Sequence, residues 1–176
     1  MPQKWLETKE WNLQSEELFN LKSKITGKNK TLKEVYGSPL NGLKTALNDA
    51  FLIDETTAKK WFTKSERYSE IVKPYLRGQE LQKWHFEKDN NFIIVIPDGW
   101  TGKASSCDNE KDALNWLEQN YPDIGEHLMP FRDRAIKRSD KGEFWWELRP
   151  CKFYDKFQNS KIVWPEISQG PKFLLD

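Results

Sequence analysis

The chain has 176 residues, of which 37% are hydrophobic, 14% aromatic and 31% charged, and its formal net charge is +1. This length suits one ordinary domain, or one domain with a helical appendage. The mean hydropathy is -0.85, no apolar run approaches about 18 residues, and the amino terminus lacks the apolar middle of a signal peptide. These features exclude a membrane protein and indicate a cytoplasmic one.

Residues 1–39 predict a helical lead-in. Ser15 is a suitable N-cap for a helix over 15–26, because its hydroxyl can accept a hydrogen bond from the first turn, and Gly27 ends that helix. Thr31 then begins a second short helix. We interpret this amphipathic, lysine-rich segment as a linker that packs against a domain outside the chain.

From residue 40 onward, predicted strands and helices mix without the regular alternation of a doubly wound sheet. We therefore expect an α+β fold over 40–176, with a mixed or antiparallel sheet and flanking helices. In chain order the pattern predicts a buried strand at 50–53, helical turns at 56–63, an irregular extended segment at 71–81, a hairpin over 84–97 with its turn at 88–91, a loop at 97–103, helices at 110–120 and 123–138, strands at 142–149, 161–168 and 171–176, and an aromatic helical turn at 153–157.

Three tryptophans carry expectations about the core. Successive residues of a strand face opposite sides, so one of Trp145 and Trp146 should be buried. The other is then available to cover a neighbouring domain or DNA. Trp84, which follows Lys83, is expected to be part of the core.

The side chains that bind metals do not form a known pattern. A zinc site would need Cys107, Cys151, His85 and His127 together, and these residues have neither CxxC nor HxxxH spacing. Two cysteines are also too few for a disulfide framework and fit a reducing compartment. We expect no metal site, and neither histidine has an evident nucleophile beside it.

The templates for DNA-modifying chemistry are incomplete as well. An adenine methyltransferase needs a glycine-rich loop for its methyl donor and an Asn/Asp-Pro-Pro-aromatic loop for the flipped base. The chain has no Pro-Pro pair, and PDGWTGK (97–103) lacks the GxxxxGK[ST] and GxGxxG spacings. A restriction nuclease needs a second acid with a lysine two positions later, and no acid after Asp98 has one. We expect no catalytic centre in this chain.

Basic residues gather in two stretches although the net charge is small. Five lysines and no acid lie between Lys22 and Lys33, and the stretch from Arg132 to Lys152 has seven basic and four acidic residues. Attraction to phosphate is local at physiological salt, so such stretches suit contact with DNA. Solvated helix faces are the alternative interpretation.

Four stretches, taken in order, resemble the specificity domain at the carboxyl end of TaqI-like N6-adenine DNA methyltransferases. They are GLKTALNDAFLID (42–54), IVKPYLRGQELQKW (71–84), GEFWWELR (142–149), and KIVWPEIS followed by KFLLD (161–176). In addition, YPDIGEHLMPFRDRA (121–135) resembles the helical insert of that family. Type IIG restriction-modification enzymes and related phage-exclusion methyltransferases share the module. One departure is Ala46, because the family often has glycine after the Lys-Thr pair.

The resemblance implies that residues 40–176 are a target recognition domain of a larger enzyme and bind double-stranded DNA. The parent's methyltransferase domain, upstream of this part, would bind S-adenosylmethionine and methylate adenine at N6. This part would hold no cofactor and would recognise the bases around the target. The recognised sequence, and whether the parent also cleaves DNA, stay open.

Base edges are recognised by forked or bidentate side chains on loops, with lysines and arginines beside them for phosphates. On that logic the candidate DNA-binding residues are Lys44, Thr45, Asn48, Arg77, Gln79, Lys83, Arg132, Arg134, Arg149 and Lys161. Local alternatives stay open for several of them. In these alternatives Asn48 and Asp49 cap a turn, Arg77 binds a buried acid next to its loop, and the 132–134 stretch forms a solvated helix face.

Two other function classes remain. The chain could instead be a protein-interaction scaffold within a restriction-modification or phage-exclusion complex, with its aromatic surface and the 15–26 helix docking partner domains. An enzyme built on an unfamiliar template is the third class, and a cleft of perturbed carboxylates would indicate it.

Overall fold

The computed structural model describes residues 15–86 and 90–176. The chain divides between Gly42 and Leu43 into two compact units. Helices and small antiparallel sheets combine in it, which confirms the predicted α+β fold. Within the described ranges, no helix is both long enough and apolar enough to cross a membrane.

The first unit contains two short helices that begin at the predicted caps. α1 spans Glu16–Thr26, and the Ser15 hydroxyl accepts a hydrogen bond from its first turn at 3.4 Å. α2 spans Leu32–Tyr36 and begins with a capping box, in which Thr31 and Glu34 each accept a hydrogen bond from the other's main-chain N–H. Neither helix has a buried residue. Capping and the two flanking glycines therefore define these helices, rather than burial of an apolar face.

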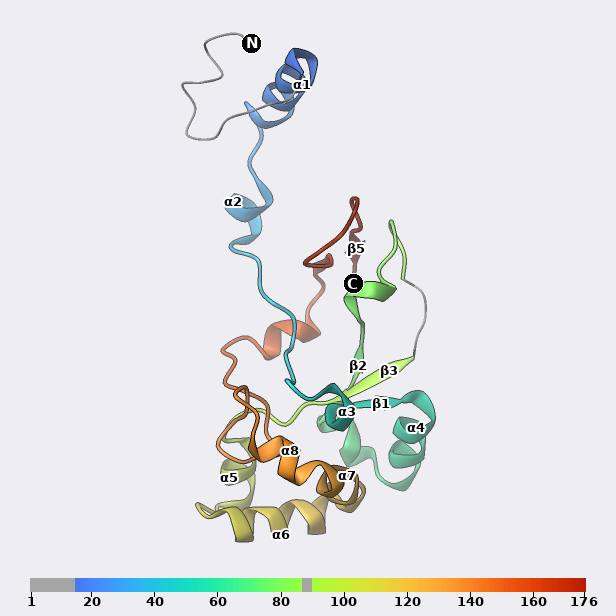
Figure 1. Cartoon of the computed structure of the whole chain (residues 1–176), viewed down its shortest axis with the longest axis vertical. Helices are drawn as coiled ribbons and strands as arrows, with labels where there is room; N and C mark the ends of the chain where they lie inside the picture. The colour runs from blue at the N-terminus through green and yellow to red at the C-terminus, as the bar shows by residue number, and fades with distance from the viewer. Residues whose placement is uncertain (1–14, 87–89) are drawn as a thin grey trace. The chain divides into compact units, whose positions relative to one another are not determined.

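A three-stranded antiparallel sheet in the order β1–β3–β2 lies at the centre of the second unit (Figure 1). β1 spans Leu52–Asp54, β2 spans Val72–Tyr75, and β3 spans Asn91–Ile94 between them. The strands are short and rich in β-branched residues, which pack well on a half-buried sheet. A second, two-stranded sheet pairs β4 (Ile162–Val163) with β5 (Leu174–Leu175) in antiparallel register.

Helices complete the second unit, and α5 to α8 gather at the end of the unit away from β4 and β5 (Figure 1). Side-chain caps begin two of these helices, with Asp54 before α4 and Asn109 before α6. The elements are α3 (Asn48–Phe51), α4 (Glu55–Lys64), α5 (Trp100–Ser105), α6 (Glu110–Asn120), α7 (Pro122–Leu128) and α8 (Arg132–Ile136), with the 3₁₀ turns η2 (Glu66–Glu70), η3 (Gly78–Glu80), η4 (Met129–Phe131) and η5 (Asp155–Gln158).

The core of the second unit joins the sheet to α3, α4, α6, α7 and α8. Its largest fully buried side chains include Phe51, Ile94, Leu117, Ile124 and Trp146. Burying a side chain of this size contributes about 1.5–3 kcal/mol relative to leaving it in water. Burial of these aromatic and aliphatic side chains therefore stabilises the second unit.

The 142–149 segment differs most from its predicted form. It is a tight turn rather than a strand, because the Glu147 N–H bonds back to the Phe144 carbonyl at 3.0 Å. The turn buries Trp145 and Trp146 together, with exposed fractions of 3% and 0%. The expectation that one of them stays outside the core is therefore wrong, since strand alternation does not apply to a turn.

Other differences concern the extent of elements. The loop predicted at 97–103 contains the start of α5, whose first turn is satisfied by a buried carboxylate. The helix predicted over 123–138 is interrupted by η4, because Pro130 has no N–H to donate. The 50–53 strand begins only at Leu52, after α3. The predicted strands at 161–168 and 171–176 shrink to β4 and β5, and the turn predicted at 88–91 falls partly outside the described residues.

Candidate functional site

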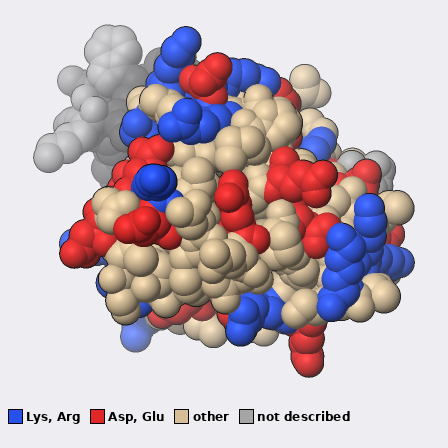
Figure 2. Space-filling view, turned by 90° about the horizontal axis from the view of Figure 1, so that it is seen from below, with Lys and Arg blue, Asp and Glu red and all other residues tan. Residues whose placement is uncertain are grey.

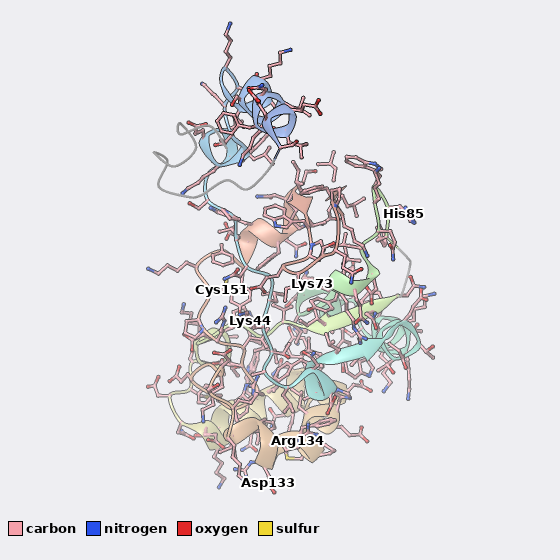
Figure 3. The ribbon with its side chains drawn as sticks, turned by 45° about the horizontal axis from the view of Figure 1, so that its top comes forward. Lys44, Lys73, His85, Asp133, Arg134 and Cys151 are labelled. Carbon is pink, nitrogen blue, oxygen red and sulfur yellow. The ribbon has the colours of Figure 1, made fainter. Side chains whose placement is uncertain are left out.

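The candidate residues predicted from the sequence do not gather on one face. Figure 3 shows His85 and Arg134 toward opposite ends of the second unit, with Lys44 between them. Candidate Lys83 lies two residues before His85. Hydrogen bonds and close contacts divide the candidates into a group around the 44–48 loop, a group of ion-paired side chains, and a group around η3 and the 164–173 loop.

The 44–48 loop uses two of its candidates to build its own structure. Thr45 is only 3% exposed, and its hydroxyl donates to Asn48 Oδ1 at 2.6 Å and accepts from the Leu47 N–H at 3.1 Å. These bonds order the loop that leads into α3, although the N-cap position of that helix, Leu47, has no side-chain cap. Ala46 has a φ of 52°, in the left-handed region that favours glycine. Lys44 is exposed, and no acid among the described residues pairs with it.

Several basic candidates are already paired with acids. An exposed ion pair contributes only roughly 0–1 kcal/mol to stability. The acid in each pair nevertheless offsets the positive charge of the basic side chain, which weakens its attraction for DNA phosphate. Figure 2, which looks at the end formed by α5 to α8, accordingly has Lys and Arg interspersed with Asp and Glu. The pairs are Arg132 with Glu110 at 3.3 Å, Arg134 with Asp49 at 2.9 Å, Arg149 with Asp140 at 3.9 Å, and Lys161 with Asp176.

Arg77 is tied to a buried acid. The Glu80 carboxylate is buried and accepts hydrogen bonds from the Arg77 main-chain N–H and from Asn91 Nδ2, both at 2.9 Å. The Arg77 guanidinium lies 3.9 Å from the same carboxylate, and its buried Nε makes no hydrogen bond to any described residue. The two residues close η3 into a compact loop, and Gln79 in that loop is exposed.

A hollow of about 360 Å³ opens beside Gln79. The loop between β4 and β5 forms its opposite wall. Gly78 lies close to this loop, since a Cβ built on Gly78 would be 3.6 Å from the Cβ of Pro165. In Figure 1 the η3 loop and the carboxyl-terminal segment that holds β5 lie at the same end of the unit. The hollow is lined by Gly78, Gln79, Pro165, Ile167, Ser168, Gln169 and Lys172.

Two of these lining residues matter chemically and were not among the candidates. Gln169 adds a second forked amide opposite Gln79, and Lys172 adds a cation. No acid of the described residues forms an ion pair with Lys172. The sequence holds a weak signal for them, since SQGPK is a polar, turn-rich stretch between two apolar runs. That signal predicts a loop but not its closeness to residue 79.

Trp84 corrects another expectation. It is 69% exposed, so its assignment to the core is wrong. The pairing of Leu81 with Phe86 and a 2.8 Å bond from the Gln82 N–H to the His85 carbonyl make a two-residue hairpin loop. Trp84 is the second loop residue and has a φ of 70°. Such a turn holds its side chain outside the body of the protein, and Lys83 beside it is exposed as well.

A second hollow, of about 330 Å³, has a different chemical character. It is lined by Gly99, Gly102, Lys103, Cys107, Asp108 and Glu143. Its two carboxylates repel phosphate, which makes it a poor place for a nucleic-acid backbone. In the part of the chain that the structure describes, no group of His, Cys, Asp or Glu is arranged to hold a metal ion.

The hollow beside Gln79 is therefore the best candidate site, with Trp84 and Lys83 on the neighbouring turn. The chain matches no protein-family model and no curated protein sequence.

Proposed function

We propose that this chain is a DNA target-recognition module that works with a separate S-adenosylmethionine-dependent adenine methyltransferase domain, or within a bifunctional restriction-modification enzyme. The module binds duplex DNA and contributes base recognition, and the chemistry takes place elsewhere. The proposal rests on the order of the four family-like stretches and on the side chains around the hollow beside Gln79.

One observation carries the proposal furthest. Two glutamine amides and a lysine, from segments about ninety residues apart, meet around one open hollow. A glutamine side chain can form two hydrogen bonds with the N6 and N7 edge of adenine, and lysine binds guanine or phosphate oxygens. Loops positioned by a scaffold suit such recognition, and on the η3 side the Glu80 carboxylate holds the loop by accepting the Arg77 main-chain N–H.

The methyl donor fits poorly at the glycine-containing loop that the described part of this chain offers. This loop, at 97–103, leads into α5, where an anion would need the first N–H groups of the helix. The buried Glu147 carboxylate already accepts from the Gly99 and Thr101 N–H groups, at 2.9 and 3.0 Å. The proposal therefore assigns S-adenosylmethionine to the separate methyltransferase domain, and it assigns no step of catalysis to residues of this chain.

A protein-interaction scaffold is the second candidate. It is favoured by α1, whose Leu18, Leu21 and Ile25 share one face at helical spacing and are each more than half exposed. An apolar stripe of this kind usually covers, or is covered by, another protein surface. The two functions make opposite predictions about charge reversal at the hollow.

The test is the affinity of the full chain for a labelled duplex of about 30 base pairs, measured by fluorescence anisotropy at about 50 mM and about 200 mM salt. Reversing Lys83 and Lys172 to glutamate should weaken binding at low salt at least tenfold, since each reversal replaces attraction to phosphate with repulsion. Arg77 is a poor choice for reversal, because a glutamate there would face the buried Glu80 carboxylate and disturb the loop.

The matched control reverses Lys60 and Lys111, which lie on α4 and α6, are exposed, and change the net charge equally. The proposal requires the control to bind DNA like the unmodified chain. It fails if the unmodified chain has no measurable affinity at low salt, or if both double variants lose affinity equally. Intact DNA affinity together with lost binding to partner domains would favour the scaffold.

A further inference from the structure

Trp84 occupies a position that folding alone does not favour. Trp84 is the third residue of the four-residue turn, and at this position a φ near 70° is normally adopted by glycine or asparagine. A bulky side chain is strained there, and 69% of this one is left in water. Neither the backbone conformation at this position nor burial of the ring therefore stabilises the fold.

The turn is nevertheless held firmly. The Trp84 N–H donates to the Phe173 carbonyl at 3.2 Å, which joins the turn to the loop between β4 and β5. Leu81, at the base of the turn, is buried. Strained backbone that its surroundings hold in place is typical of sites that present a side chain to a ligand.

The surroundings of the ring are cationic and polar rather than apolar alone. Lys83 and His85 flank it in the turn, and both are exposed. Lys172, in the wall of the hollow, directly precedes the residue whose carbonyl accepts the Trp84 N–H. An exposed ring with lysines near it is the combination that binds single-stranded or unstacked nucleic acid, since bases stack on the ring while the lysines meet phosphates.

We propose that Trp84 stacks on a base, or in the gap left by a base, where the target duplex is opened beside the hollow. The inference rests on the proposed DNA-binding function and adds the ligand class of this turn. Both faces of a base inside an intact duplex are covered by its neighbours, so the ring gains a stacking partner only where the stack is interrupted. Binding should therefore favour interrupted duplexes.

The experiment compares three labelled duplexes of one sequence, which are fully paired, carry one abasic position, or carry one extra unpaired base. The full chain should bind the interrupted duplexes at least about 5-fold more tightly than the paired one, the smallest effect expected of one base–aromatic stack. Trp84→Gly should abolish the preference, measured as the ratio of the affinities for the interrupted and the paired duplexes. Trp84→Phe should keep most of it.

Glycine is the informative replacement because it suits a φ of 70° better than any other residue. Trp84→Gly should therefore unfold no more easily than the unmodified chain, and a lost preference cannot be blamed on a damaged fold. Trp164→Ala is the control for a nearby exposed tryptophan, at 46% exposure, and should keep the preference.

The inference is overturned if the chain binds DNA but Trp84→Gly retains the preference, or loses affinity for all three duplexes alike. Either result leaves the DNA-binding proposal standing. If the unmodified chain binds no DNA at low salt, the proposed function fails and this inference falls with it. A change in self-association by Trp84→Gly without a change in DNA preference would mark the turn as a protein contact instead.

Discussion

The guanidinium of Arg138 donates a 2.7 Å hydrogen bond to the main-chain carbonyl of Thr45, a residue 93 positions earlier in the chain. The same group donates to the carbonyls of Trp145 and Glu147 at 2.7 and 2.9 Å, and it lies 4.4 Å from the centre of the Phe51 ring. Burial lowers the pKa of Arg138 to about 10, so the side chain remains charged at neutral pH. One buried cation thus joins the 44–48 loop to the 142–149 turn.

Arg138→Lys should lower the free energy of unfolding by about 2 kcal/mol, because lysine keeps the charge but cannot reach carbonyls on two sides of the planar fork. Urea unfolding measures the change. Arg132→Lys is the matched control, since Arg132 is exposed and forms an ion pair with Glu110. A loss below about 0.5 kcal/mol at Arg138, the range of ordinary surface substitutions, would contradict the joining role.

Ala46→Gly should raise the free energy of unfolding by about 0.5–1 kcal/mol. Ala46 has a φ of 52°, and an L side chain is strained there while glycine is not. The gain is reduced, but not cancelled, by the greater freedom of glycine in the unfolded chain. Thermal and urea unfolding both report the change.

The matched control for that prediction is Ala104→Gly, within α5. Ala104 is exposed and helical, so glycine there should cost about 0.5–1 kcal/mol. Opposite signs for the same chemical change are the expected outcome. Destabilisation by both substitutions would mean that the positive φ at residue 46 is not the governing feature.

Local signals in the sequence predicted much of the helical structure. Ser15 and Thr31 cap α1 and α2 as expected, because a cap needs only residues within the next turn. The α+β fold follows from the same local patterns. The limits of the strands were predicted less well, since pairing with a distant partner decides how far a strand extends.

The candidate site depended on contacts that local patterns cannot predict. Gln79 was identified from its loop, but Gln169 and Lys172 reach it only through the β4–β5 connection. Trp84 was expected in the core because tryptophan is usually buried, and the turn that exposes it has no glycine to mark it. The opposite error occurred at 142–149, where a turn buries both tryptophans.

Trp146→Phe should destabilise the protein by at least about 1 kcal/mol more than Trp145→Phe. Both rings are buried, but Trp146 Nε1 donates to the Thr101 hydroxyl at 2.9 Å, whereas Trp145 Nε1 makes no hydrogen bond in the described structure. Removing the first indole N–H leaves a buried hydroxyl without its donor, and removing the second loses no hydrogen bond. Equal losses in urea unfolding would contradict this difference.

Stability should fall as the pH drops below 6.5, in part because of His127. Its Nε2 donates to the Ala50 carbonyl at 3.0 Å, and burial lowers the pKa of the ring from 6.5. The unfolded chain then binds the proton more readily, so acid favours unfolding until the folded ring is also protonated. Between pH 7 and pH 5 the unmodified chain should lose more stability than His127→Gln, which can keep the hydrogen bond. An equal loss would rule out this contribution.

Lys172→Ala should reduce the salt dependence of duplex binding. Each lysine that meets a phosphate releases counterions, so removing one lowers the slope of log K against log salt by roughly 1. Arg132→Ala removes the same charge from α8, which lies at the other end of the unit and where Glu110 already pairs with that arginine. The slope should therefore stay unchanged for Arg132→Ala. If the slope instead falls for Arg132→Ala and not for Lys172→Ala, the α8 surface meets the DNA backbone, and the hollow beside Gln79 is not where the duplex lies.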